Sequence, residues 1–286
     1  MKSYTHHFSS FRYLLSILII GHVYVGHAQN LVPNYSFETF TTCPTSYEGL
    51  CFGFAPPWSC PTTGSSDLFN SCGNPSMAGV PNNAIGSQLA NTGEGYAGFI
   101  CFWPSINNYR EYITAPLTAP LIAGEWYYVS FFISLADSGC GVENVGAHFS
   151  TSPIFQPQIT TLMLDPQVEN TTGMINDNQG WVFIGGCFQA AGGEAYITIG
   201  NFYNDNETPL DPDCSSSNYN YFYIDDVSVV QGAAPEEILI ELGDPVVECF
   251  TYEIDPDHDG PFYLWSDGST GPTLVVTESG VYTLTV

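Results

Sequence analysis

Basic side chains are almost absent from this sequence, which has 3 Lys and Arg residues against 29 Asp and Glu residues. Lys2 and Arg12 lie in the first 28 residues, so residues 29–286 carry Arg110 alone and a formal charge of −28. Binding to nucleic acid or to an anionic membrane surface needs clustered Lys and Arg. The sequence therefore excludes both partners, and acidity this strong favours divalent cations and solubility.

Candidate catalytic bases are also scarce. After residue 28 there is no lysine, and the histidines are His148 and His258. Nucleophilic sites of the Ser-His-Asp or Cys-His type need a histidine base, and no Gly-x-Ser-x-Gly motif accompanies either histidine. A glycosidase needs only two carboxylates, but no pair among the many stands out. We therefore expect a protein that is not an enzyme, with a structural role for His148.

The only long apolar run lies at the start, where residues 1–28 have the features of a secretory signal. Lys2 and Arg12 supply a basic region, and residues 13–25 form an apolar stretch that is too short to span a bilayer. Small residues at 26–28 offer a cleavage site before Gln29. We expect an exported protein, extracellular or on the outer cell surface, with no transmembrane segment in the mature chain.

The rest of the chain has the alternating pattern of β-strands and no convincing helical period. The clearest strand spans residues 126–135. Its core face is predicted to hold Tyr127, Val129, Phe131, Ile133 and Leu135; its other face holds Trp126, Tyr128, Ser130, Phe132 and Ser134. Further strands are expected at residues 96–103, 109–114, 181–188, 195–202 and 219–230. The fold class is therefore predicted to be all-β.

Two adjacent carboxylates, Asp225 and Asp226, interrupt the apolar run at residues 219–230. Side chains alternate across a strand, so only one of them can face a packed sheet, and a buried aspartate needs a cation or several donors. Upstream, residues 30–38 form an apolar stretch ending in Glu38. We predict that these segments are the first and last strands of one sandwich. Glu38 and Asp225 are then expected to share a structural Ca²⁺, with Asp226 as an alternate ligand.

The two segments also carry a family resemblance. Residues 30–38 (NLVPNYSFE) and 223–229 (YIDDVSV) resemble the two ends of jelly-roll, galactose-binding-like carbohydrate-binding modules. Segments between them resemble a version found on Bacteroidota surface proteins; these lie at residues 56–58, 67–72, 109–113, 134–137 and 192–194. The resemblance implies a jelly-roll β-sandwich over residues 29–231 that binds a polysaccharide or cell-surface glycan without catalysis.

A second module is expected after a linker at residues 232–237. Residues 238–286 resemble an immunoglobulin-like module of bacterial surface proteins, with short strands predicted at 246–251, 262–265, 273–276 and 281–286. Such a module normally continues for another strand, so we expect an incomplete domain from a longer multidomain protein. The resemblance implies an architecture associated with gliding motility and type IX secretion.

Aromatic residues around the lone arginine suggest a ligand site. Arg110 lies between Tyr109 and Tyr112, and Trp58, Trp103 and Trp126 are further candidate platforms for a sugar ring. Arginine can hold hydroxyl groups while ring faces contact C–H groups. The alternative is an arginine paired with one of the many carboxylates and aromatic residues buried in the core. The rival functions are a purely structural stalk, and an accessory domain of a hydrolase whose catalytic part lies outside this chain.

Nine cysteines follow the signal, which points to disulfides in an exported protein. Eight lie before the linker and are expected to pair among themselves, and the nested spacing suggests Cys43–Cys72 enclosing Cys51–Cys60. The ninth, Cys249, is predicted to be a free thiol here, with its partner beyond Val286. No Cys-x-x-Cys motif occurs, so zinc is not expected.

One further acidic segment, at residues 255–260, matches the first half of a calcium loop. Position 12 of that loop is Ser266 rather than Glu. We expect a solvated hairpin loop there.

Overall fold

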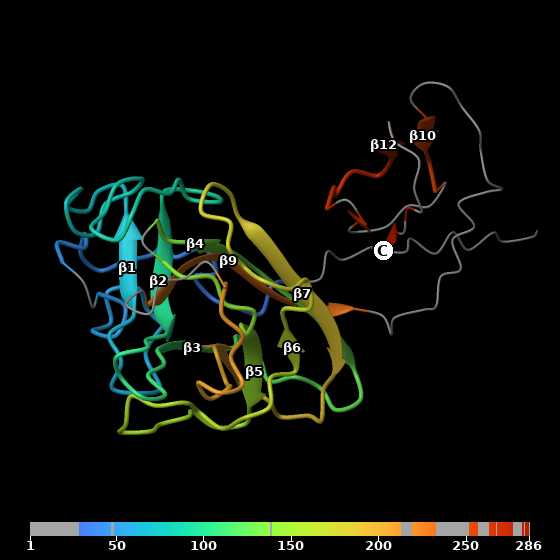
Figure 1. Cartoon of the computed structure of the whole chain (residues 1–286). Coiled ribbons are helices and arrows are strands. Elements are labelled where there is room, and N and C mark those ends of the chain that lie inside the picture. The colour runs from blue at the N-terminus through green and yellow to red at the C-terminus, as the bar shows by residue number, and fades with distance from the viewer. Residues whose placement is uncertain are drawn as a thin grey trace, which may run out of the picture.

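The computed structural model describes residues 29–46, 49–137, 139–212, 219–232, 252–256, 263–266, 268–276, 282 and 284–285. All regular structure in these ranges is β-structure, and no helix in them is long and apolar enough to cross a membrane. Residues 29–232 form a jelly-roll β-sandwich of two antiparallel sheets (Figure 1). The predicted all-β class is confirmed.

The larger sheet has five strands in the order β1-β2-β9-β4-β7, and every neighbouring pair is antiparallel. Its strands are β1 (Asp67–Asn70), β2 (Gly95–Phe102), β4 (Trp126–Leu135), β7 (Val182–Gln189) and β9 (Asn220–Gly232). The 13-residue β9 is the central strand. The segment that carries the adjacent carboxylates therefore lies at the middle of the larger sheet.

The smaller sheet has four strands in the order β3-β8-β5-β6. Its strands are β3 (Tyr112–Pro116), β5 (Gly146–Ser150), β6 (Val168–Glu169) and β8 (Tyr196–Gly200). The inner faces of the two sheets share one core, in which Phe131 of β4 packs in the same apolar cluster as Phe149 of β5 and Ile197 of β8. Burying a side chain of this size contributes about 1.5–3 kcal/mol.

The alternation predicted for β4 is confirmed. Tyr127, Val129, Phe131, Ile133 and Leu135 are buried in the core cluster. On the other face the rings of Trp126, Tyr128 and Phe132 are partly exposed. The outer face of β4 therefore carries aromatic rings that remain partly exposed to solvent.

The first segment lies beside β9, as predicted, but it is not a strand. The Leu31 amide donates to the Val229 carbonyl at 2.8 Å, and the Asn30 side chain bonds the Val227 carbonyl and the Val229 amide, each at 3.0 Å. Two residues later, Pro33 lacks an N–H that could pair with a strand, and Asn34 has a φ of 49° in the left-handed region. The chain therefore turns after two residues instead of extending the sheet.

The strict alternation expected across the two aspartates fails at Asp226. This residue has a φ of 50°, in the left-handed region, and the pairing of β9 with β4 shifts register between Ser130 and Phe132. Such a bulge places an extra residue in one strand and redirects its side chain. Both carboxylates thereby reach the same neighbouring segment, as described below.

Other strand boundaries differ modestly from the prediction. β3 begins at Tyr112 rather than residue 109, because Tyr109 and the two residues after it are held by side-chain contacts. β1, β5 and β6 were not predicted as strands. They have two to five residues each, which is too short for an alternating pattern to identify.

Four short strands follow the sandwich. β10 (Tyr252–Ile254) pairs with β12 (Leu274–Val276), and β11 (Leu264–Trp265) pairs with β13 (Leu284–Thr285). β11, β12 and β13 lie within three of the four ranges expected for the second module, and β10 begins directly after the fourth. The expected strand at 246–251, Cys249, the linker after Gly232 and most of the acidic loop at 255–260 lie outside the described residues. The immunoglobulin-like identity of this module stays a prediction.

Candidate functional site

The adjacent carboxylates of β9 bind the segment that precedes β2. Asp225 is buried, and its Oδ2 accepts the backbone N–H groups of Asn91 at 3.0 Å and Thr92 at 3.2 Å. Asp226 accepts from the Asn91 side-chain amide and the Thr92 hydroxyl, each at 2.6 Å. Burial raises the pKa of Asp225 to about 8, and the neighbouring Asp226 adds to the rise. Two carboxylates thus face one short loop, which holds them by hydrogen bonds.

Glu38 reaches the same loop from the N-terminal segment. Its Oε1 accepts the backbone N–H groups of Glu94 at 2.8 Å and Gly95 at 2.9 Å. Gly93 has a φ of 64°, and a Cβ there would overlap the Glu38 carboxylate. The residues predicted to bind Ca²⁺ therefore all reach residues 91–95; they are Glu38, Asp225 and Asp226. We call these three carboxylates, together with residues 91–95, the acidic corner.

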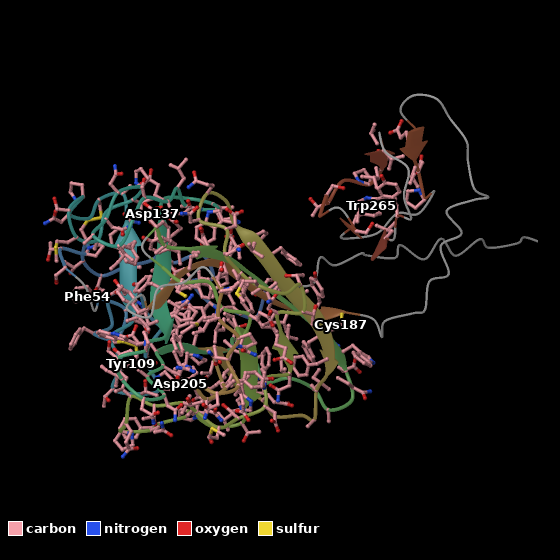
Figure 2. All side chains as sticks on the ribbon, in the orientation of Figure 1. Phe54, Tyr109, Asp137, Cys187, Asp205 and Trp265 are labelled. Carbon is pink, nitrogen blue, oxygen red and sulfur yellow. A yellow bond between two sulfur atoms is a disulfide. The ribbon has the colours of Figure 1, made fainter. Side chains whose placement is uncertain are left out.

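The lone arginine is a structural residue of the interior. The Arg110 guanidinium is fully buried; it forms a 2.9 Å ion pair with Asp205 and lies 5.5 Å from the centre of the Phe102 ring. It also donates to the carbonyls of Tyr109 and Tyr203, at 2.8 and 2.9 Å, and to the Thr208 hydroxyl at 3.1 Å. Tyr109 and Asp205 lie close together at this end of the sandwich (Figure 2). The arginine fastens the loop after β8 and has no exposed donor for a ligand.

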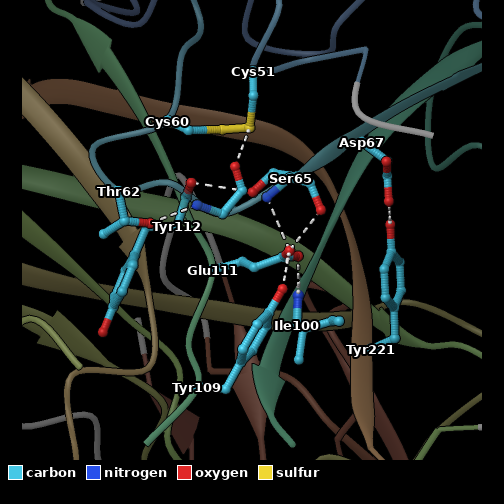
Figure 3. The surroundings of a disulfide bond; sticks show 12 residues. Cys51, Cys60, Thr62, Ser65, Asp67, Ile100, Tyr109, Glu111, Tyr112 and Tyr221 are labelled. Carbon is cyan, nitrogen blue, oxygen red and sulfur yellow. Dashed lines mark hydrogen bonds between the residues drawn. A yellow bond between two sulfur atoms is a disulfide. The ribbon is translucent and has the colours of Figure 1, made fainter. Parts of the chain in front are cut away.

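Beside the arginine, Glu111 is a buried hydrogen-bond hub (Figure 3). Its Oε1 accepts the Ser65 amide at 2.9 Å, the Ser65 hydroxyl at 3.1 Å and the Tyr109 hydroxyl at 2.9 Å. Its Oε2 accepts the Ile100 amide at 3.0 Å. With 1% of its surface exposed, this carboxylate is an anchor for three chain segments and faces no substrate.

Four of the six residues predicted to contact a sugar are buried. Trp58 donates its indole N–H to the Asn34 carbonyl at 2.9 Å, and Tyr112 donates its hydroxyl to the Asn201 carbonyl at 2.6 Å. Arg110 and Tyr109 are buried as described. Trp103 and Trp126 are partly exposed, and the Trp103 ring centre lies 5.1 Å from that of Tyr109. The structure thus gives Trp58, Tyr109, Arg110 and Tyr112 positions in the interior.

Partly exposed rings instead gather on the outer face of β4 and β7. Phe132 pairs in register with Phe183, and their ring centres are 5.3 Å apart in an edge-to-face contact. Trp126 and Tyr128 continue the row along β4, and burial raises the pKa of Tyr128 to about 12, so its hydroxyl stays neutral. We call Trp126, Tyr128, Phe132 and Phe183 the aromatic strip.

A glycine in β7 shapes the floor of the aromatic strip. A Cβ at Gly185 would lie 2.7 Å from the Phe183 ring and 3.0 Å from the Tyr128 hydroxyl. The absence of a side chain lets the Phe183 ring lie over the strand and approach the tyrosine. Phe132, Phe183 and Tyr128 are therefore close together, and Trp126 lies two residues from Tyr128 on the same face of β4.

Another part of the outer face of this sheet is covered. Residues 71–92 pack on it through a second apolar cluster that includes Tyr96 and Tyr223, and the Asn83 side chain bonds both tyrosine hydroxyls, at 3.1 and 2.9 Å. The Trp181 indole N–H donates to the Leu89 carbonyl at 3.0 Å, just before β7 begins. Leu89 itself is 70% exposed. The cover thus ends beside the aromatic strip.

The sequence already placed Trp126, Tyr128 and Phe132 on the face of β4 away from the core. It did not show that this face stays open, because that depends on how far residues 71–92 extend over the sheet. Tyr128 and Phe132 were not predicted as site residues, and neither was Phe183. Its register opposite Phe132 follows from the pairing of β4 with β7, which no local pattern reveals.

The disulfides Cys43–Cys72 and Cys51–Cys60 are present, as predicted. The expectation that all eight cysteines of this domain are paired is wrong, because Cys101 and Cys187 are free thiols. Cys101 faces the core from β2, whereas Cys187 is exposed on the outer face of β7 (Figure 2). Two strands separate β2 from β7, so the thiols are at least about three strand spacings, roughly 14 Å, apart, too far for a disulfide.

No protein-family model matches the sequence, and no curated protein sequence is significantly similar to it. The solved structures that resemble the fold include the CBM22-1 xylan-binding domain from Paenibacillus barcinonensis Xyn10C, with 13% identity and a TM-score of 0.39, over 73% of this chain and 97% of that domain. TmCBM61 in complex with β-1,4-galactotriose has 14% identity and a TM-score of 0.32, over 72% and 100%.

An arabinose-bound α-L-arabinofuranosidase, MgGH51, has 14% identity and a TM-score of 0.41 over 71% of this chain, which spans only 26% of that enzyme. The neighbours therefore include carbohydrate-binding modules. At TM-scores below 0.5 and identities of 14% or less, these likenesses carry no argument about the ligand of this chain.

Proposed function

We propose that residues 29–231 form a non-catalytic carbohydrate-binding domain whose ligand lies on the aromatic strip. The observation that carries the proposal is the row of partly exposed rings on adjacent strands, at the edge of the cover formed by residues 71–92. Exposed apolar surface of this kind marks binding sites on soluble proteins. Flat rings fixed on strands offer a rigid surface to the C–H face of a sugar, and ring-edge groups such as the Tyr128 hydroxyl can bond its hydroxyls.

A binding role without catalysis is supported by the state of the carboxylates. Glu111 is enclosed by donors, and Asp67 of β1 accepts the Tyr221 hydroxyl at 2.5 Å inside the sheet. Asp225 is buried in the acidic corner. A glycosidase needs two carboxyl groups facing one substrate bond, and these three are engaged within the protein.

Export is supported by the signal-like residues 1–28 and by the two disulfides, which persist in oxidising compartments. The proposed location is extracellular or on the outer cell surface, within a longer multidomain protein. The family resemblance of the sequence extends this proposal to a Bacteroidota surface protein of the gliding-motility and type IX secretion kind.

A structural Ca²⁺ in the acidic corner is part of the proposal. Glu38 and Asp225 would hold the ion, with Asp226 as alternate ligand, and the ion would fix the loop at residues 91–95 to β9. Ca²⁺ takes six to eight oxygen ligands, and a cation would stabilise the buried Asp225 carboxylate beside Asp226. The ion would have to share or replace the backbone N–H groups that Glu38 and Asp225 accept. In the described part of the chain no three His, Cys, Asp or Glu side chains are grouped to hold a metal, so carbonyl oxygens would supply the remaining ligands.

Affinity gel electrophoresis of the mature chain tests the proposed function. Gels containing hydroxyethylcellulose, mixed-linkage β-glucan, galactan or glucomannan are compared with a gel without polymer. The proposal expects retardation by at least one polymer. Unretarded migration in all of them, together with no signal on a glycan array, would favour a structural stalk module.

A further inference from the structure

No lysine or arginine side chain is available on the surface of residues 29–286. The only one in this range, Arg110, is fully buried against Asp205. His148 lies on β5 in the other sheet, with its Nδ1 2.7 Å from the Asp165 carbonyl. His258 is the one remaining histidine. At neutral pH the protein therefore offers a ligand no Lys or Arg cation.

The polar groups that share the face of the aromatic strip are neutral. Ser130 of β4 lies opposite Ser228 of β9, and Gln189 of β7 lies opposite Trp126. Glu125 precedes β4 and is exposed, with its Oε2 accepting from the Gln231 side chain at 3.0 Å. Side chains directly opposite each other share one face of a sheet. Hydroxyl and amide groups therefore lie on the same face as the rings, whereas Gln231 pairs with Tyr127 and holds Glu125 toward the core face.

We infer that the aromatic strip selects uncharged polysaccharides and rejects polymers that carry carboxylate or sulfate groups. The inference rests on the proposed carbohydrate-binding function and names its substrate class. Sugar hydroxyls can donate to serine and amide oxygens, whereas recognition of an anionic group uses charge-assisted bonds from Arg or Lys. The net charge of −28 on residues 29–286 also repels a polyanion. Both effects act in the same direction here.

The test uses each neutral polymer that retards the mature chain, in three forms of the same backbone. One sample is untreated, one is oxidised at its primary hydroxyls to carboxylates, and one is oxidised and then methyl-esterified to remove the charge. We expect binding to the oxidised polymer to be at least about tenfold weaker. Methyl esterification should restore it, which separates the effect of charge from the loss of the hydroxyl group. In 0.5 M NaCl the oxidised polymer should regain part of its binding, because salt screens the repulsion.

A variant with an added positive charge tests whether the rejection of anionic polymers arises at the aromatic strip. Gln189→Lys adds a cation beside Trp126, while Gln158→Lys adds the same charge in the segment that packs over the smaller sheet. We expect Gln189→Lys to bind the oxidised polymer at least about threefold more tightly than Gln158→Lys, the size of one exposed charge pair. Equal gains in both variants would show that net charge, rather than the strip, sets the selectivity.

Two results overturn the inference while the proposed function stands. One is equal binding of the untreated and oxidised polymers in 20 mM salt. The other is binding of the oxidised polymer that requires Ca²⁺ and is lost in chelator, since an ion would then bridge acidic groups on both partners. Failure of every untreated polymer to bind would instead overturn the proposed function, and this inference with it.

Discussion

Arg110 and Asp205, 95 residues apart in the sequence, form a 2.9 Å ion pair in which the arginine is fully buried and the aspartate is 25% exposed. Removing one partner leaves an uncompensated buried charge, which costs about 3 kcal/mol or more. We expect Asp205→Asn to lower the free energy of unfolding by about 3 kcal/mol, measured by urea denaturation. Glu207→Gln removes the same charge from an exposed residue of the same loop and should change it by about 0.5 kcal/mol or less. Equal effects would show that the ion pair contributes nothing specific.

Glu111 gives a second stability prediction. Glu111→Gln keeps the shape of the side chain but replaces one acceptor oxygen by an NH₂ group, which then faces a donor in the buried hub. An unsatisfied buried group costs about 1–3 kcal/mol, and we expect a loss in that range by urea denaturation. Tyr109→Phe removes a single donor and should cost about 1 kcal/mol. A neutral Glu111→Gln variant would contradict the role of the carboxylate as an anchor.

The aromatic strip predicts a separation of binding from stability. Trp126→Ala and Phe183→Ala should each weaken polysaccharide retardation at least about fivefold, or ~1 kcal/mol, because a few central aromatic residues dominate most interfaces. The matched control is Phe155→Ala, which removes a ring that is 77% exposed outside the strip. If the control weakens binding as much as the strip variants do, the ligand does not lie on β4 and β7.

Ca²⁺ should stabilise the mature chain. An ion that binds only the folded state, at a hundredfold excess over Kd, adds about 2.7 kcal/mol, which raises the Tm by roughly 5–10 °C for a domain of this size. Differential scanning calorimetry in CaCl₂ and in chelator measures this difference. Glu38→Gln should lose the response and Glu207→Gln should keep it. A Tm that is the same in CaCl₂ and chelator would rule out the proposed site.

Thiol labelling should distinguish the two free cysteines. Cys187 is exposed and should react in the folded protein, whereas Cys101 is buried and should react only after denaturation. Burial raises the pKa of the Cys187 thiol, so less of the reactive thiolate forms at neutral pH and labelling should accelerate as the pH rises through 9. Peptide mapping after chymotrypsin cleavage identifies the sites, with Cys187→Ser as the control. Labelling of Cys249 in the denatured, non-reduced chain would support its predicted free state.

Much of the sandwich was predictable because β4 and β9 are long enough for their alternation to be read. The buried face of β4 was predicted residue by residue. Whether its opposite face was open could not be predicted, since residues 71–92 cover the sheet only as far as Leu89 and Trp181. Local patterns record which side chains share a face, but not which distant segment lies on it.

The residues predicted to contact a sugar also show that a local pattern does not reveal contacts from distant segments. An arginine between two tyrosines has the same local pattern in a ligand site and in a packed interior. The contacts that bury Arg110 come from Asp205 and Thr208, almost a hundred residues later in the chain. By contrast, the two segments that carry Glu38 and Asp225 lie beside each other as predicted. The partners of both carboxylates are N–H groups of residues 91–95, which were not predicted, and the shared Ca²⁺ stays a prediction.

The central position of β9 determines how the sandwich carries mechanical load. Any segment that continues beyond Gly232 pulls on the end of this strand, which pairs with β4 on one edge and with β2 and the Leu31 segment on the other. A force along the strand axis therefore loads the hydrogen bonds of both edges in shear, all together, instead of peeling them apart one after another. A ligand held on β4 and β7 would transmit tension to the next module through the adjacent strand.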